Sequence, residues 1–312
     1  MNAKNSIDLS VVIPVYNEEH NLSELYRRLT MVLGKELRVK YELLFVDDGS
    51  SDSSWSIVEE LHKRNKNVKG IKLSQNCGHD LAIKTGIDHC RGRIAVFMDS
   101  DLQHPPEILE EIYKSISSGE CDILFLKRIS NENEQFSRKI VNRLYYYCFK
   151  KMTGIDISEG ISDFFAVNEK VIAVVKEFKE KSYFNRGVVL SIGFRKKFLE
   201  YKAGKRFAGE SKYRMKDLFQ LSVKSFVNFS AVPLKLVTVL GLCLSLLSFA
   251  YGLYSIIKTL LVGSISGWAS IITTVSFLNG FIILLLAIFF EYFVVMFNEI
   301  KNRPPYIIDK IL

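Results

Sequence analysis

The feature that most constrains the fold is a pair of long uncharged runs near the end of the chain. One is Leu236–Ile257, 22 residues, and the other is Thr259–Phe290. About 20 apolar residues in a helix cross the hydrocarbon core of a bilayer, and neither run shows the periodic polar face of a soluble core helix. The second run is too long for one crossing, and Gly263–Gly267 supplies a loop within it. We therefore expect two transmembrane helices, at about 234–257 and 270–297.

Cationic side chains flank these runs on one side only. The segments before the first span and after the second are rich in lysine and arginine, whereas the connecting loop has only Lys258. By the positive-inside rule, both termini are cytoplasmic and the loop faces out. The sequence thus predicts a multi-pass protein of the cytoplasmic (inner) membrane. We expect a cytoplasmic domain at 1–230, a membrane part at 231–297 and a cytoplasmic tail at 298–312.

The first part of the chain alternates short apolar segments with longer segments of helical spacing. This alternation is typical of a mostly parallel, doubly wound α/β sheet, which binds ligands beyond the carboxyl ends of its strands. A helix is expected at His79–Cys90, and Pro105 and Pro106 are expected at a helix start. The predicted strands are Leu9–Val15, Tyr41–Val46, Val68–Leu73, Arg93–Met98 and Asp122–Leu126.

Net charge and cysteine content narrow the class of partner. The formal charge of +8 suits nucleic acid, anionic lipid headgroups or phosphorylated ligands. No zinc-finger spacing and no aromatic-basic RNA signature is present, so we do not expect a nucleic-acid partner. The five cysteines form no CxxC pair, which indicates reduced thiols facing a cytosol. A homo-oligomer is compatible with the sequence.

Polar clusters follow three of the predicted strands. They are Pro14–Glu19, Asp47–Asp52 and Asp99–Asp101. One such cluster alone is as readily an ordinary turn and helix cap. Three of them at the same edge of one sheet indicate a ligand site instead.

Asp99 and Asp101 end an apolar strand and repel one another. Residues two apart in an extended segment point the same way, so both carboxylates can face the crevice. Such a pair is stabilised by a shared proton or a shared cation. Mg²⁺ or Mn²⁺ takes one or two carboxylates and completes its shell with water and phosphates. The pair therefore predicts a clamp for a metal-bound diphosphate.

The order of these motifs carries a resemblance to a known family. The segments PVYNE, VDDGS, DSDLQ and RFAGESKY, which begin at Pro14, Val46, Asp99 and Arg206, resemble the successive motifs of inverting family 2 glycosyltransferases. More narrowly, the chain resembles polyprenyl-phosphate glycosyltransferases such as dolichol-phosphate mannose synthases and bactoprenol glucosyltransferases. The likeness covers nearly the whole chain. It implies a GT-A type, Rossmann-like sheet with two C-terminal transmembrane helices.

The resemblance also implies roles for single residues. Asp101 and Gln103 would ligate Mg²⁺ or Mn²⁺, and a basic loop with Arg206 and Lys212 would close over the phosphates, where the alternative is a membrane-anchoring patch. Asp163, which matches an Asp-Phe pair beside the acceptor, would position acceptor or sugar, with helix capping as the alternative. The catalytic set is thus Asp163, Asp101 and Arg206, and the remaining contacts to the nucleotide sugar would come from Pro14, Tyr16, Glu18, Val46, Asp48, Asp99, Ser100 and Arg128.

The acceptor implied by the resemblance is a polyprenyl phosphate at the bilayer surface. Segments 135–152 and 213–229 have an apolar side flanked by cations or polar groups, as in amphipathic helices of the membrane interface. Arg138 and Arg143 on the first of them are candidates for contact with the lipid phosphate. Some positions depart from the family pattern: its common Asn-Phe-Gly-Lys-Glu is here NCGHD, Asn76–Asp80.

Several functions remain open at this stage. The favoured reaction is transfer of glucose from UDP-glucose to undecaprenyl phosphate, for modification of cell-envelope glycans such as lipopolysaccharide O-antigen. GDP-mannose, UDP-N-acetylhexosamine and aminoarabinose donors are alternatives. A processive polysaccharide synthase is disfavoured, because neither Trp55 nor Trp268 follows an arginine as its Gln-x-x-Arg-Trp motif requires. A non-catalytic membrane protein that binds nucleotide sugars is disfavoured by the intact aspartate pair.

Overall fold

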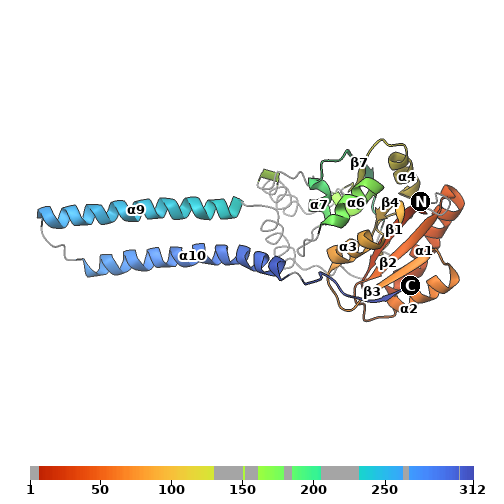
Figure 1. Cartoon of the computed structure of the whole chain (residues 1–312), viewed down its shortest axis with the longest axis horizontal. Coiled ribbons are helices and arrows are strands. Elements are labelled where there is room, and N and C mark those ends of the chain that lie inside the picture. Colours follow the sequence, from red (N-terminus) through yellow and green to blue (C-terminus); the bar gives the residue numbers. More distant parts are fainter. Residues whose placement is uncertain are drawn as a thin grey trace. The chain divides into compact units, whose positions relative to one another are not determined.

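The computed structural model describes residues 7–129, 150–151, 161–178, 185–204, 232–262, 267–301 and 303–312. The chain divides into two compact units. The first comprises Met1–Lys150, Ile155–Arg214 and Arg303–Leu312, and the second comprises Lys151–Gly154 and Met215–Asn302. The sheet belongs to the first unit, and two long helices belong to the second (Figure 1).

The described residues of the first unit form one eight-stranded sheet in the order β7-β5-β6-β4-β1-β2-β3-β8. All five predicted strands are present with bounds that differ by two residues at most. Three strands were not predicted: β6, β7 and β8. The bounds are β1 Ile7–Val15, β2 Tyr41–Asp47, β3 Val68–Leu73, β4 Gly92–Phe97, β5 Ile123–Arg128, β6 Ile161–Asn168, β7 Lys196–Tyr201 and β8 Ile308–Ile311.

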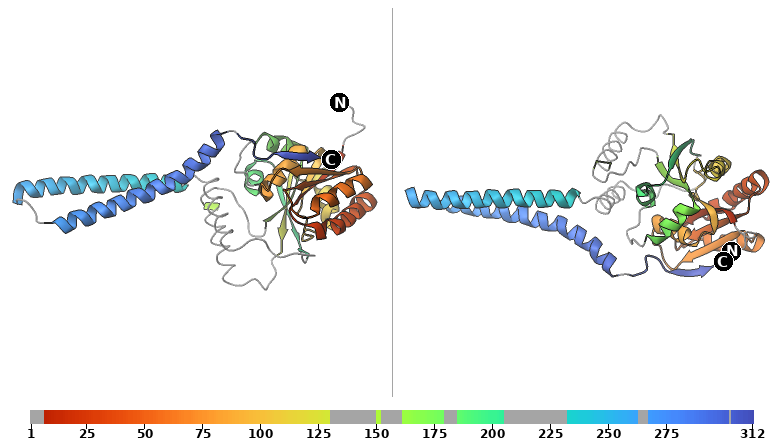
Figure 2. Two further views of the ribbon diagram at one scale, coloured as in Figure 1. Left: turned by 90° about the horizontal axis from the view of Figure 1, so that it is seen from below. Right: turned by 45° about the horizontal axis from the view of Figure 1, so that its top comes forward.

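The sheet is mixed but mostly parallel, as expected. Strand β1 pairs in parallel with β2 and β4, β2 with β3, and β5 with β7. Strand β6 is antiparallel to both β4 and β5. Its first residues therefore lie at the edge where β4 and β5 end. Strand β8, from the end of the chain, is antiparallel to β3 and forms one edge of the sheet (Figure 2).

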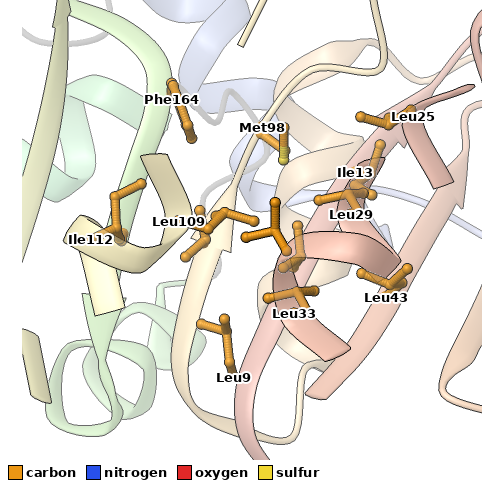
Figure 3. Packing of buried hydrophobic residues seen from close by; sticks show 14 of the residues in the cluster. Leu9, Ile13, Leu25, Leu29, Leu33, Leu43, Met98, Leu109, Ile112 and Phe164 are labelled. Carbon is orange, nitrogen blue, oxygen red and sulfur yellow. The ribbon is translucent and has the colours of Figure 1, made fainter. Parts of the chain in front are cut away.

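One face of the sheet is covered by helices α1 Glu19–Met31, α2 Ser54–Arg64 and α4 Leu109–Ser117, the last preceded by the 3-10 turn η3 Pro106–Ile108. Leu22, Leu25 and Leu29 form a fully buried stripe on α1. It packs with alternate residues of β1, among them Leu9 and Ile13, in one apolar cluster (Figure 3). Burial of these side chains is the main favourable term for docking the helices. The segment Val32–Leu37 continues α1 as a wider π-helical turn.

The other face is covered by α3 His79–His89, α6 Glu169–Glu177 and α7 Asn185–Ser191. Helix α3 lies very close to β1, since a Cβ added at Gly86 would lie 2.1 Å from Val12 Cγ1. This close approach fixes where the first residue of α3 lies relative to the strand ends. Helix α6 is capped by Asn168, whose side-chain oxygen accepts a hydrogen bond from the Val171 N–H at 3.1 Å. Asp163 lies in β6 instead, so the helix-cap alternative for Asp163 is wrong.

The second unit contains α9 Val232–Val262 and α10 Trp268–Ile300, which lie side by side (Figures 1 and 2). Within α10, Phe277–Phe297 has a mean hydropathy of 2.5 and is long and apolar enough to cross a membrane. It is the one such stretch among the described residues, and the described apolar stretch of α9 is shorter, Leu234–Leu244. The predicted amphipathic segments 135–152 and 213–229 lie outside the described residues, except for Lys150 and Lys151.

Candidate active site

A cavity of about 410 Å³ opens at the carboxyl edge of the parallel strands. Eight residues that the sequence predicted for the site line it: Pro14, Tyr16, Glu18, Asp48, Asp99, Ser100, Asp101 and Asp163. Asn76, Gly78, His79 and Ala82 line it as well, and the sequence reasoning gave them no role. Five of these lining residues are aspartate or glutamate, so the cavity wall formed by the described residues is strongly acidic.

The sheet topology explains why these carboxylates meet. Asp48 follows β2, while Asp99 and Asp101 follow β4, and both strands run in parallel with β1. Asp163 comes from the opposite direction, because it stands near the beginning of the antiparallel strand β6. The expectation that the acidic strand ends share one edge is confirmed.

Asp48 braces a loop of the cavity wall. Its carboxylate accepts hydrogen bonds from the backbone N–H groups of Cys77 at 2.7 Å and Gly78 at 2.9 Å. Burial raises the pKa of Asp48, and these two N–H donors oppose that rise. The loop between β3 and α3 is thus held against the end of β2. Asp48 shapes the cavity as well as lining it.

Asp101 is held at the cavity by the residue two positions later. Its oxygens accept hydrogen bonds from the Gln103 N–H at 3.0 Å and from Gln103 Nε2 at 2.7 Å. Leu102 between them has φ of 64°, a left-handed conformation that a branched residue adopts only under constraint. The Gly204 N–H donates to the Gln103 carbonyl at 3.0 Å and holds the turn in place.

Arg128 also reaches this turn. It ends β5, as predicted, and its Nη1 donates to Gln103 Oε1 at 3.2 Å. Arg128 and Gln103 do not line the cavity themselves, and Val46 is fully buried within β2. Arg138, Arg143, Arg206 and Lys212 lie outside the described residues.

The Asp101–Gln103 turn suits a hard divalent cation. The Asp101 carboxylate is a ligand that Mg²⁺ accepts, whereas the Gln103 amide turns its nitrogen toward Asp101 and its oxygen toward Arg128. The ion usually completes its shell with water and substrate phosphates. No cluster of three or more His, Cys, Asp or Glu side chains able to hold a metal occurs among the described residues. A single carboxylate at this turn would leave most of the positions around such an ion to water and to other ligands.

Asp99 is surrounded by two histidines. His79 Nε2 lies 2.8 Å from Asp99 Oδ1, and His104 Nδ1 accepts a hydrogen bond from the Asp99 N–H at 2.9 Å. Burial alone would raise the pKa of Asp99, but the imidazoles and Arg186 lower it well below its usual value. Asp99 is therefore a carboxylate at neutral pH.

Asp163 and Asp80 are fixed by α7. Arg186 Nε lies 3.0 Å from Asp163 Oδ1, and Arg186 Nη1 donates to the Ile161 carbonyl at 3.0 Å. Asn185 Nδ2 donates to Asp80 Oδ1 at 2.8 Å. No sequence signal marked Arg186 or Asn185, because only the fold brings α7 to β6 and α3. His79, by contrast, was visible as a departure from the family pattern.

Comparison with known proteins identifies the family of this chain. The family model Glycosyl transferase family 2 matches residues 10–175. An uncharacterized glycosyltransferase of Bacillus subtilis is 37% identical to this chain. The aligned region covers 97% of this chain and 94% of the Bacillus protein. A prophage-derived bactoprenol glucosyl transferase of Shigella flexneri is 30% identical, covering 97% of each chain. Mannosyl-3-phosphoglycerate synthase from Rubrobacter xylanophilus shares the fold, with TM-score 0.50 and 11% identity over 70% of this chain and 71% of that chain.

Proposed function

The chain belongs to glycosyl transferase family 2, and from that premise we propose that it transfers a sugar from a nucleotide sugar to a polyprenyl phosphate. The proposed donor is UDP-glucose and the proposed acceptor is undecaprenyl phosphate. The observation that carries the proposal is the acidic cavity, where carboxylates from three strand ends face one space. Similarity over nearly the whole length to bactoprenol glucosyl transferases supports the choice of sugar and lipid.

We assign different residues of the site to binding of the nucleotide, the diphosphate and the acceptor. Pro14, Tyr16, Glu18 and Asp48 would hold the base and ribose, and Asp99 and Ser100 the ribose or diphosphate. Asp101 and Gln103 would hold Mg²⁺ or Mn²⁺. When bound, such an ion offsets the negative charge that gathers on the leaving diphosphate. Arg206 and Lys212 would act on the same charge from a closing loop.

The acceptor supplies its own nucleophile. A phosphate monoester has a second pKa of about 6, so its oxygen is largely ionised at neutral pH. That oxygen forms a bond to the anomeric carbon while the bond from this carbon to the diphosphate breaks on the opposite side, which inverts the configuration. No strong base is required. Asp163, held by Arg186, would position the acceptor or sugar.

Replacing Asp163 by asparagine should therefore slow transfer by about tenfold or more without abolishing donor binding. The rate should still rise with pH through the acceptor's second pKa, about 6, in both proteins. The measurement is a pH–rate profile at saturating lipid, with donor affinity followed by calorimetry. A flat profile in the variant would assign proton removal to Asp163, and an unchanged rate would remove Asp163 from the site.

Strand β8 bears on the membrane topology. It follows α10 in the chain, yet it pairs with β3 in the same sheet as the rest of the first unit. A sheet lies entirely on one side of a membrane, so the chain between 204 and 303 must cross an even number of times. With Phe277–Phe297 as one crossing, α9, 31 residues long, supplies the second. We therefore propose two spans, with the sheet and both termini in the cytoplasm.

A reporter fused after Leu312 should accordingly read as cytoplasmic, and one inserted near Ser264 as external. The matched control is a fusion after Val262 with α10 removed, which should also read as external. Both full-length reporters on the same side would contradict the two-span proposal. Transfer itself is tested by incubating membranes with labelled nucleotide sugars and undecaprenyl phosphate, followed by extraction of the lipid product.

A further inference from the structure

The segment Arg303–Leu312, which follows α10 in the chain, returns to the sheet beside the cavity. We call it the C-terminal segment. Its strand β8 pairs antiparallel with β3, with Ile308 opposite Leu73, the last residue of β3. The contact continues beyond that strand, because the Ser74 N–H donates to the Ile307 carbonyl at 2.9 Å. The C-terminal segment therefore supports both β3 and the start of the loop that follows it.

That loop, Ser74–Gly78, joins β3 to α3 and forms part of the cavity wall through Asn76 and Gly78. Asp48 holds the half of the loop next to α3, where its carboxylate accepts two backbone N–H groups. The half next to β3 is held by the backbone of Ile307. The loop is thus supported by two segments that are far apart in the sequence.

The C-terminal segment is itself anchored on both sides of this contact. Tyr306 Oη donates to Asp88 Oδ2 on α3 at 2.9 Å, and Lys84 Nζ donates to the other oxygen of Asp88 at 2.6 Å. Burial and the Asp88 carboxylate raise the pKa of Tyr306, so its hydroxyl keeps the proton that it donates. At the other end, the Leu312 N–H donates to the Gly70 carbonyl at 2.8 Å, and the Leu312 side chain packs against the apolar core.

The place where β3 leaves the sheet depends on β8. In the sheet order, β3 lies between β2 and β8, so it would be an edge strand without the C-terminal segment. The register of the two strands shifts between Lys72 and Leu73, directly before the loop. Such an irregularity bends a strand, and it is frequent next to functional sites. Pairing with β8 therefore sets the direction in which the chain enters the loop.

We propose that the C-terminal segment is a positioning element of the donor site: its pairing with β3 holds the loop Ser74–Gly78 in the conformation that binds the nucleotide sugar. The structure describes all of Arg303–Leu312, and none of these residues lines the cavity, so their effect on the donor passes through the loop. This inference rests on the proposed function, because it assigns a nucleotide sugar to the cavity. Because the segment follows α10, the donor site is completed only after both long helices have been synthesised.

Deleting residues 303–312 should weaken donor binding by about tenfold or more. A loop that adopts its binding conformation only about a tenth of the time lowers the apparent affinity about tenfold. Saturating donor selects that conformation, so the donor KM should rise while kcat stays within a few-fold of the original. Asp101 and Asp163, assigned to metal and acceptor, do not belong to this loop. A merely structural role would instead reduce the amount of active protein, which lowers kcat and leaves KM unchanged.

The experiment compares the full-length protein in detergent with the deletion and with point variants. Calorimetry gives the affinity for UDP-glucose, initial rates give kcat and KM, and mass spectrometry follows hydrogen exchange of the Ser74–Gly78 amides without donor. Tyr306→Ala removes the anchor on Asp88 and should give a smaller loss of affinity with faster loop exchange. This variant decides the matter if the deletion does not fold.

Phe198→Ala is the matched control for Tyr306→Ala. Phe198 is an aromatic residue of β7, the strand at the opposite edge of the sheet, and it stacks on Phe125 with ring centroids 5.9 Å apart. Its replacement should lower thermal stability and leave donor affinity, donor KM and loop exchange unchanged. The comparison separates a general loss of stability from a loss of support for the loop.

Unchanged donor affinity in both the deletion and Tyr306→Ala would overturn the proposal, and so would a lower kcat at an unchanged donor KM. Failure of the proposed function is a different outcome. In that case the original protein forms no lipid-linked sugar from any donor, while its affinity for UDP-glucose and the exchange of its donor-free loop still decide whether the C-terminal segment holds the loop in place.

Discussion

Replacing Asp101 by asparagine should lower the rate of sugar transfer by at least about a hundredfold, the scale of losing a main electrostatic contact in a transition state. The carboxylate stands at the cavity wall, is only 7% exposed, and is held by two hydrogen bonds from Gln103. An asparagine has nearly the same size and keeps one accepting oxygen for Gln103, but it removes the charge that a divalent cation requires. The measurement is initial rate against Mg²⁺ or Mn²⁺ concentration.

The chain offers a matched control for that variant. Asp122 is equally buried, 7% exposed, but it lies just before β5, at the opposite end of that strand from Arg128. It pairs with Arg195 and accepts a hydrogen bond from Asn168 Nδ2 at 2.8 Å. Asp122→Asn should lower stability and leave transfer and its metal dependence nearly unchanged. Near-normal transfer by Asp101→Asn without added divalent ion would refute the role given to Asp101.

Replacing Asp48 by alanine should weaken donor binding by about a hundredfold and lower the free energy of unfolding by about 2–4 kcal/mol. The stability loss is the cost of leaving two half-buried backbone N–H groups, those of Cys77 and Gly78, without their charged acceptor. The affinity loss follows because the freed loop carries Asn76 and His79 of the cavity wall. Calorimetric titration with UDP-glucose and thermal unfolding measure the two effects.

Asp52→Ala is the control for this loop. Asp52 also accepts two backbone N–H groups, from Ser54 at 3.0 Å and from Glu19 at 3.2 Å, but it does not line the cavity. It should cost stability with little change in donor affinity. Equal donor affinity in Asp48→Ala and the original protein would show that the loop does not shape the nucleotide site.

The fold could be predicted where apolar strand segments and helical segments alternate along the chain. The five predicted strands are short and largely apolar, and their alternation with helices indicates a parallel sheet. The three missed strands lack that signal. Strand β6 enters the sheet antiparallel between β4 and β5, β7 begins with two lysines and lies at an edge, and β8 is a short strand in the predicted tail. The positions of these strands in the sheet depend on pairing with distant segments, and such pairing produces no periodic pattern in the local sequence.

The site could be predicted where acidic side chains directly follow a parallel strand. Asp48, Asp99 and Asp101 could be placed together because parallel strands end at one edge. Asp163 reached the cavity by a route that the sequence did not indicate, through a reversed strand. Arg186 comes from a helix that contacts the site only in the folded chain. His79 stands where the sequence departs from the family pattern, but its contact with Asp99 is visible only in the folded chain.

The central claim is that this chain joins a sugar to a polyprenyl phosphate, and product formation tests it most directly. Purified protein is incubated with undecaprenyl phosphate, Mg²⁺ or Mn²⁺, and labelled UDP-glucose, GDP-mannose, UDP-N-acetylhexosamine or an aminoarabinose donor, each with Asp101→Asn in parallel. We predict an organic-extractable lipid carrying label from UDP-glucose, dependent on the divalent ion and at least about a hundredfold weaker in the variant. Label in the lipid from another donor would change the sugar but keep the reaction. Label released only into water, or no lipid product from any donor, would contradict the account.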